Sequence, residues 1–205
     1  MDVFAEMQRR YREGDLPWDQ SLPPPEVVDL AAAMAPGRAL DLGCGAGRAC
    51  IYLARHGWDC DGVDFVPDAI ALAQARARAA GMAEHAHFRV ASVTRLDALQ
   101  PPYDLALDVG CLHNLRGDDP RAYAMGLARL VRPVRLVRPG GQYLLFAHLS
   151  DEADEAARFG MPESTIRATF DATFAVERVE RGSTTIGETL RASAWFWMRR
   201  TATVR

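Results

Sequence analysis

Three glycines and an aspartate in the first third of the chain have the spacing of a ligand site. Gly43, Gly45 and Gly47 follow the apolar run 38–42 and precede a helical pattern, and Asp64 ends a second apolar run. Glycines at a strand-to-helix turn let the backbone approach a ligand closely. A carboxylate at the end of the next strand can pair with the diol of a ribose. The pattern predicts a nucleoside pocket and leaves open which nucleoside compound it holds.

The spacing of the glycines distinguishes between two candidate cofactors, S-adenosylmethionine and a dinucleotide. The turn reads G-x-G-x-G, whereas the dinucleotide fingerprint G-x-G-x-x-G requires a glycine where Arg48 stands. Asp41, at the leading edge of the turn, would repel a pyrophosphate but suits the cationic methionine end of S-adenosylmethionine. We therefore expect S-adenosylmethionine as cofactor, with S-adenosylhomocysteine as product. A NAD-dependent oxidoreductase is the less favoured alternative.

The elements that must position these residues alternate along the chain. The periodicity predicts strands over 38–42, 58–63, 86–90, 103–108 and 141–148, and helices over 2–13, 25–35, 46–56, 67–80, 119–132 and 162–170. Two further strand-like runs, 175–180 and 190–199, are separated by a short polar loop and predict an antiparallel pair at the sheet edge. The expected fold is α/β and Rossmann-like. It is a doubly wound, mostly parallel seven-stranded sheet with an antiparallel C-terminal edge hairpin and helices on both faces.

Composition and charge indicate which classes of binding partner are expected. The 205 residues carry a formal net charge of −3 without a basic run, so nucleic acid is not expected as a partner. There is no stretch of membrane-spanning length and no signal-peptide pattern at the start, so we expect no membrane association and a cytoplasmic location. No metal site is predicted, because the cysteines lack C-x-x-C spacing and no cysteine or carboxylate stands at ligand spacing from His85 and His87. A tandem repeat, 129–133 copied as 135–139, is assigned no function.

Four segments, in this order, resemble motifs of the class I S-adenosylmethionine-dependent methyltransferases. They are 40–48, 62–64, 103–108 and 136–141. Residues 1–36 are then expected to form an N-terminal helical cap on a methyltransferase domain over 37–205. Segments 15–19 and 108–114 are similar to parts of the thiopurine, thiol and halide methyltransferases, and the second also to the tellurite-resistance methyltransferases. Those relatives methylate small soft nucleophiles.

The resemblance implies roles for individual residues. It places the methionine portion of the cofactor beside Asp41 and the three glycines, and the ribose at Asp64. The adenine is expected near Phe65, which is otherwise a core aromatic, and near the Ser92 hydroxyl or the Val93 amide, which otherwise form an ordinary loop. The remaining cofactor candidates are Trp18 and Asp108.

The acceptor is expected after the fourth parallel strand, where a doubly wound sheet presents ligands. The candidate pocket residues are Tyr11, Cys111, His113 and Asn114. Tyr11 and Trp18 form either a lid over the cofactor and acceptor or a hydrophobic staple for the first helix. His113 is either a general base, needed for a hydroxyl or amine acceptor, or a residue that only lines the pocket of a soft anion.

The function predicted from the sequence is methyl transfer to a small molecule by in-line displacement, with sulfur or another soft nucleophile as the favoured acceptor. A non-catalytic regulatory protein that binds S-adenosylmethionine on the same fold is the main alternative. The sequence leaves open whether the protein is a monomer or a homodimer.

Overall fold

The first three strands are short, and the first two are buried along most of their length, which is typical of parallel strands covered on both faces. β1 (Arg38–Leu42), β2 (Asp59–Asp64) and β3 (Ala86–Val90) pair in parallel with β2 in the middle. Parallel neighbours require crossover connections. These are α3 (Arg48–Arg55) and α4 (Pro67–Ala79), and they follow α1 (Val3–Glu13) and α2 (Pro25–Ala33).

The later elements build a mixed set of strands. The computed structural model describes residues 3–131, 140–151 and 159–201. β4 (Leu105–Val109) and β5 (Gln142–His148) are parallel, and β7 (Thr189–Arg200) runs antiparallel to both β5 and β6 (Phe174–Ile186). The helical elements of this part are η1 (Leu112–Asn114), α5 (Asp119–Leu130) and α6 (Glu163–Phe170).

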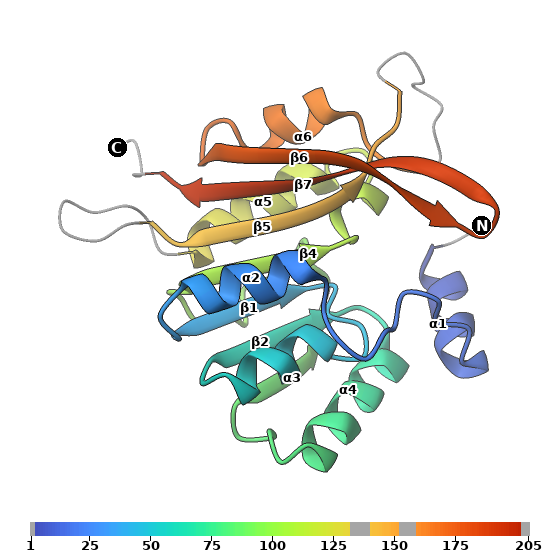
Figure 1. Ribbon diagram of the computed structural model, residues 1–205, viewed down its shortest axis with the longest axis vertical. Helices are drawn as coiled ribbons and strands as arrows, with labels where there is room; N and C mark the ends of the chain where they lie inside the picture. The colour runs from blue at the N-terminus through green and yellow to red at the C-terminus, as the bar shows by residue number, and fades with distance from the viewer. Residues whose placement is uncertain (1–2, 132–139, 152–158, 202–205) are drawn as a thin grey trace. The chain divides into compact units, whose positions relative to one another are not determined.

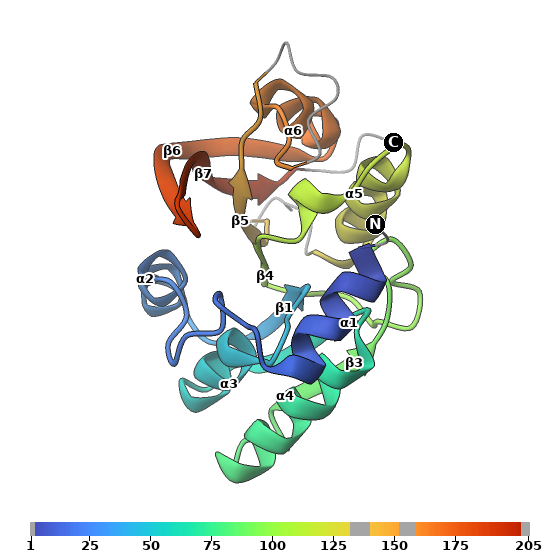
Figure 2. The same ribbon diagram turned by 90° about the vertical axis from the view of Figure 1, so that its right-hand side faces the viewer.

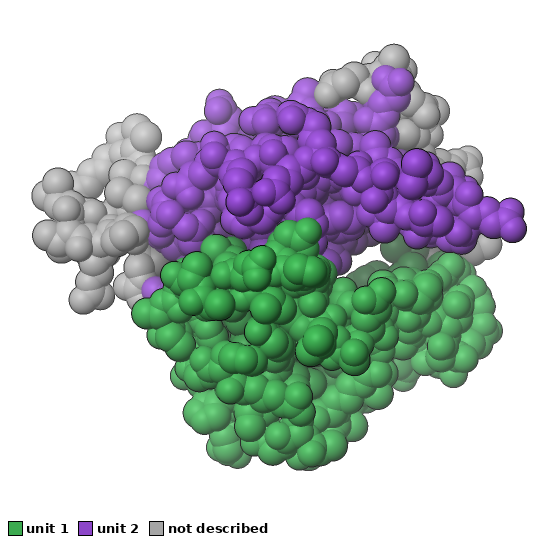
Figure 3. Space-filling view, in the orientation of Figure 1, with its two compact units in different colours: residues 1–93 green, residues 94–205 purple. Residues whose placement is uncertain are grey.

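All these strands belong to one seven-stranded sheet in the order β3-β2-β1-β4-β5-β7-β6 (Figure 1). The predicted fold class, a mostly parallel Rossmann-like sheet with an antiparallel C-terminal pair and surrounding helices, is confirmed. The chain divides into two compact units, residues 1–93 and residues 94–205 (Figure 3). No helix in the described part of the chain is long and apolar enough to span a membrane.

The C-terminal strand pair is longer than predicted. β6 continues through the expected polar loop to Ile186, and only two residues separate it from β7. Since β7 pairs with β5 through residues 193–199, residues 183–192 form a two-stranded extension beyond β5. The helix predicted over 119–132 ends at Leu130, and the rest of the tandem repeat, residues 132–139, lies outside the described residues.

The core of the second unit is aromatic on one face of β5. Side chains alternate between the two faces of a strand. On one face of β5, Tyr143 packs against Phe170 and Phe174 at ring-centroid distances of 5.3 and 5.6 Å, and all three are buried. Phe146, three residues along, packs instead against Trp195 of β7 at 5.0 Å. The two faces of β5 thus carry separate aromatic groups.

Candidate functional site

The glycine turn between β1 and α3 is held against β2 by its backbone. The amides of Gly43 and Cys44 both donate to the carbonyl of Val63, at 2.8 and 3.0 Å. Gly43, Gly45 and Gly47 have φ values of +71°, +54° and +81°, a left-handed region that residues with a Cβ rarely adopt. The turn therefore requires glycine at all three predicted positions.

Packing adds a second reason for two of these glycines. A Cβ on Gly47 would lie 2.6 Å from Cζ of Phe88, and one on Gly45 would lie 2.6 Å from the hydroxyl oxygen of Tyr11. The Tyr11 hydroxyl and the Phe88 ring therefore lie directly against the backbone of the turn. The amides of Gly43, Gly45 and Gly47 all donate to acceptors within the protein, so the glycines serve close packing at this turn.

The carboxylate of Asp64 is buried at the end of β2 and faces the turn. Its Oδ2 accepts from the Gly45 amide at 3.0 Å and its Oδ1 accepts from the Val66 amide at 2.9 Å. Burial raises the pKa of Asp64, and the amide hydrogen bonds act in the opposite direction. A carboxylate has about four lone-pair sites, so Asp64 keeps acceptor capacity for hydroxyl groups.

A second buried carboxylate, Asp41, makes the turn electronegative. Asp41 is 4 % exposed, and the Cys50 thiol lies 3.9 Å from its Oδ2. Burial raises the pKa of the Cys44 thiol, and the charges of Asp41 and Asp64 raise it further. This negative potential suits a cationic ligand and opposes a pyrophosphate.

The predicted adenine neighbours lie beside Asp64. Phe65 is partly exposed, with its ring 5.5 Å from that of Phe4. The amide of Ala91 donates to the Asp64 carbonyl at 2.9 Å, which ties the loop after β3 to the end of β2. Ser92 is exposed and Val93 is buried, so of this pair the serine side chain is the accessible one.

Helix α1 lies against α4 and carries Tyr11 over the glycine turn (Figure 2). The rings of Tyr11 and Trp18 meet edge to face at 6.4 Å, and the Arg10 guanidinium lies 5.4 Å from the Trp18 ring. Burial raises the pKa of Tyr11, and the charge of Asp64 adds to this shift. Tyr11, predicted for the acceptor pocket, thus lies with the predicted cofactor residues.

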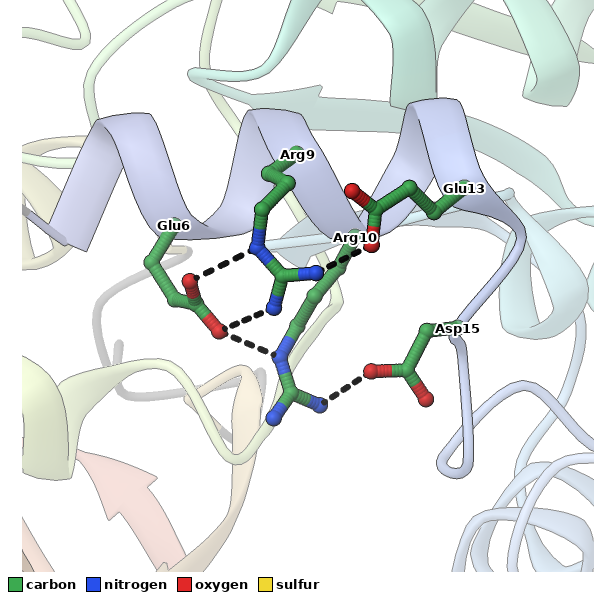
Figure 4. Close-up of polar contacts among 5 residues, drawn as sticks. All are labelled: Glu6, Arg9, Arg10, Glu13 and Asp15. Atoms are coloured by element: carbon green, nitrogen blue, oxygen red, sulfur yellow. Dashed lines mark hydrogen bonds and ion pairs between the residues drawn. The ribbon is translucent and has the colours of Figure 1, made fainter.

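Arginines and carboxylates on and just after α1 form a connected set of ion pairs (Figure 4). Glu6 accepts from Arg9 and Arg10, which lowers its pKa to about 2, and Arg9 also pairs with Glu13. Arg10 reaches on to Asp15 at 3.6 Å. These i,i+3 and i,i+4 pairs favour the helix and orient Arg10 toward Trp18.

An ion pair that was not predicted from the sequence holds the segment that follows α1. Arg76 on α4 donates two hydrogen bonds to the carboxylate of Asp19, at 2.9 and 2.7 Å. The pairing could not be predicted from residue spacing, because 57 positions separate the two residues. The pair fixes Trp18 beside α4.

In the second unit, Asp108 is fully buried and hydrogen-bonded within the protein. It accepts from the amides of Cys111 and Leu112, at 2.7 and 2.9 Å, and from the hydroxyl of Tyr123 at 2.9 Å. The Tyr123 hydroxyl also lies 2.9 Å from that of Tyr143. Burial raises the pKa of Asp108 to about 6 against the effect of these bonds. This carboxylate, predicted to contact the cofactor, holds the turn after β4 through these bonds.

That turn contains the predicted acceptor residues. The Asn114 side chain donates to the Gly110 carbonyl at 2.9 Å, and Cys111 is partly exposed. His113 is buried, and its Nδ1 accepts from the His148 amide at 3.4 Å. Burial lowers the pKa of His113 to about 3, helped by His148 and Arg116, so the ring is neutral near pH 7.

Other clusters in the described residues do not add a site. No group of three metal-ligating side chains is found among them, and His85 pairs with Asp59 at 2.8 Å. A surface groove on the first unit contains none of the predicted site residues; it is lined by Gln74, Ala77, Arg78, Ala83, Ala86, His87, Phe88 and Arg89.

Known proteins with similar sequence include several methyltransferases. Residues 39–134 match the family model described as a methyltransferase domain. A 2-heptyl-1-hydroxyquinolin-4(1H)-one methyltransferase of Mycobacteroides abscessus is 28% identical over 63% of this chain and 54% of its own length. The chain spans about half or less of the length of the first curated relatives that it matches.

Solved structures agree in fold. One, described as "Conversion of a Disulfide Bond into a Thioacetal Group during Echinomycin Biosynthesis", superposes with a TM-score of 0.77 and 25% identity over 97% of this chain and 93% of that one. TehB from Haemophilus influenzae superposes with a TM-score of 0.72 and 17% identity over 94% of this chain and 66% of its own. Other structures of this fold contain S-adenosylhomocysteine.

Proposed function

Because the chain carries a class I S-adenosylmethionine-dependent methyltransferase domain, we propose that it transfers a methyl group from S-adenosylmethionine to a small molecule, with sulfur or another soft nucleophile as the acceptor. The observation that carries this proposal is the first unit's glycine turn with Asp64 beside it. Small-molecule acceptors, a cytoplasmic location and the absence of a nucleic-acid partner belong to the same proposal.

The residues of the turn fit this cofactor. Asp64 has acceptor capacity for two ribose hydroxyls, and the glycines of the turn place no side chain between the backbone and a ligand. The buried charges of Asp41 and Asp64 favour the cationic methionine end. We assign Phe65 and the Ser92 loop to the adenine side, and Tyr11 and Trp18 to a lid over the cofactor.

When bound, S-adenosylmethionine supplies an electrophilic methyl group on a sulfonium sulfur. The protein contributes by holding cofactor and acceptor in line and by excluding water. We assign water exclusion to α1, since it carries Tyr11 over the turn. We assign Asp108 a positioning role, since its carboxylate holds the backbone of Cys111 and Leu112 and leaves the cofactor to other residues.

His113 is proposed to line the acceptor site without removing a proton. Its Nδ1 accepts the His148 amide hydrogen, so the neutral ring carries its own proton on Nε2 and donates from there. A pKa of about 3 also makes it a weak base. A thiol ionises near pH 8.5 and needs little assistance, which favours a soft acceptor over an amine or alcohol.

Incubation of the purified protein with S-adenosylmethionine and a panel of thiols, halides, amines and alcohols, with S-adenosylhomocysteine as the readout, tests this function. We expect turnover with thiols that persists in His113→Gln. Turnover confined to amines or alcohols and abolished by His113→Gln would contradict the soft-acceptor assignment. Cofactor binding without turnover on any acceptor would favour the regulatory alternative.

A further inference from the structure

The second unit carries a group of aromatic rings at the end of β5, which we call the aromatic cluster: His113, Phe146, His148, Phe159 and Trp195. The ring centroids of His113, His148 and Phe159 lie 4.9 to 5.5 Å from one another. The Phe146 ring lies 5.1 Å from that of His148 and 5.0 Å from that of Trp195. Phe146, Phe159 and Trp195 are each partly exposed. The cluster therefore presents ring surface as well as packing internally.

The position of the cluster is where this class of sheet binds ligands. His148 is the last residue of β5, and His113 lies in the turn directly after β4. In open α/β sheets, ligands bind outside the carboxyl ends of the parallel strands. The tyrosines and phenylalanines that form the unit's core lie on the other face of β5, so the cluster is not needed to complete that core.

Two buried polar atoms in and beside the cluster lack partners. Within the described residues, neither Nδ1 of His148 nor the hydroxyl of Ser150 has a hydrogen-bond partner, and both atoms are buried. An unpaired buried polar group costs roughly 1–3 kcal/mol. Native proteins satisfy nearly all such groups, so these atoms indicate a polar group of a ligand at this place.

Among the described residues, the charged side chains that act on the two imidazoles of the cluster are arginines. The groups that act on His113 are His148 and Arg116, and Arg191 acts on His148; burial and these charges lower the pKa of both histidines. Arg191 also lies 4.5 Å above the Phe159 ring. No carboxylate of the described residues is among the groups that act on either imidazole. The positive charge of Arg191 beside the Phe159 ring favours an anionic group over a cation.

We propose that the aromatic cluster binds the methyl acceptor, and that this acceptor is a planar aromatic compound that is neutral or anionic. The inference rests on the proposed function and narrows its substrate class. Stacking on Phe159 and Trp195 supplies affinity for a flat ring system, and His148 and Ser150 offer hydrogen bonds to a polar ring substituent.

Three probes of matched size test the proposal by calorimetric titration of the protein saturated with S-adenosylhomocysteine. They are naphthalene-2-carboxylate, its saturated decahydronaphthalene analogue, and the cation 2-naphthylmethylammonium. We expect the planar anion to bind about tenfold more tightly than either of the others. Equal affinities, or tightest binding by the cation, would overturn the proposal.

Substitutions at Phe159 connect the preference to the cluster. Phe159→Leu keeps apolar bulk but removes the ring, so we expect it to reduce the affinity for the planar anion to that of the saturated analogue. Phe159→Tyr keeps the ring and is the matched control, expected to retain the preference. An unchanged preference in Phe159→Leu would place the site elsewhere and refute the assignment.

A preceding titration with S-adenosylhomocysteine alone separates the two proposals. If the product does not bind, the proposed function fails at the cofactor. If it binds and none of the three probes does, the cluster is not an acceptor site, and the cofactor site stands without it.

Discussion

Asp64 and Asp108 both stand at the end of a parallel strand, yet their hydrogen bonds differ in kind. Asp64 accepts from the glycine turn and from the start of α4, and has acceptor capacity left. Asp108 is fully buried, and two amides and the Tyr123 hydroxyl surround its carboxylate. The first arrangement suits ligand binding, and the second fixes backbone.

The ionisation of Asp108 predicts a pH dependence of stability. Its pKa is raised to about 6 in the folded protein, against an ordinary value of 3.8. Between these values the folded state binds more protons than the unfolded chain. The free energy of unfolding contributed by this group therefore falls as pH rises, by about 3 kcal/mol. Urea unfolding between about pH 4 and 7 should show Asp108→Asn gaining stability relative to wild type as pH rises.

His113 predicts the opposite dependence. Its pKa is lowered to about 3 from 6.5, so the unfolded chain binds more protons between these values and the unfolding free energy rises with pH, by up to about 5 kcal/mol. In the same urea experiment, His113→Gln should lose stability relative to wild type as pH rises. Curves for either variant that run parallel to wild type across this range would show that the group ionises normally.

Gly47→Ala tests the packing of the glycine turn. The new methyl group would meet the Phe88 ring at 2.6 Å at a φ of +81°. Gly14 has a similar φ of +73° but no neighbour within 4 Å, so Gly14→Ala isolates the backbone effect. We expect Gly47→Ala to lower the unfolding free energy by about 1–3 kcal/mol more than Gly14→Ala. Equal losses in thermal or urea unfolding would mean that Phe88 yields without cost.

The chemistry of single residues was predictable where the backbone determines it. The positive φ values at Gly43, Gly45 and Gly47 follow from residue type, and Asp64 lies beside them as expected. The surroundings of Asp108 were not predictable, because Tyr123 and Tyr143 are distant in sequence and approach the carboxylate only through packing.

At the scale of elements, the segment after α1 is held chiefly by charge. Asp19 is largely buried beneath the Arg76 guanidinium, whereas Asp68 and Arg12 form an exposed pair at 3.0 Å. Exposed pairs contribute little, but a bidentate pair with one buried carboxylate contributes more. The two pairs join the same region to α4, so each serves as the control for the other.

Arg76→Ala is therefore expected to weaken cofactor binding by about tenfold, because it releases Trp18 and the lid that Trp18 forms with Tyr11. Arg12→Ala should change the dissociation constant for S-adenosylmethionine by less than about twofold. Calorimetric titration of both variants measures the difference. Similar affinities for the two variants would show that the lid does not contribute to binding.

The positions of β1, β2 and β3 were predictable to within one or two residues from the alternation of strand and helix patterns along the chain. The extension of β6 to Ile186 was missed because its polar residues resemble a loop when read alone; pairing with β7 keeps them extended. The short helix η1 was missed, although the carboxylate that holds its start is local: Asp108 accepts from the amides of Cys111 and Leu112, three and four residues further along the chain.

For the whole molecule, the order of the strands follows from the alternation of helices and strands, and the similarity to methyltransferases follows from the motifs at the strand ends. The identity of the methyl acceptor does not follow from these patterns. The aromatic cluster combines residues from 113 to 195, and only the folded chain brings their rings together. A sequence therefore predicts the shared cofactor chemistry of such an enzyme better than its substrate.

The most direct test of the central claim is calorimetric titration of the protein with S-adenosylmethionine, alongside NAD and the variant Asp64→Asn. We predict micromolar binding of S-adenosylmethionine, on the order of 8 kcal/mol. In Asp64→Asn, which loses the carboxylate that we assign to the ribose hydroxyls, we expect binding about 10–100-fold weaker. NAD should not bind. Binding of NAD in place of S-adenosylmethionine, or of neither compound, would contradict the account.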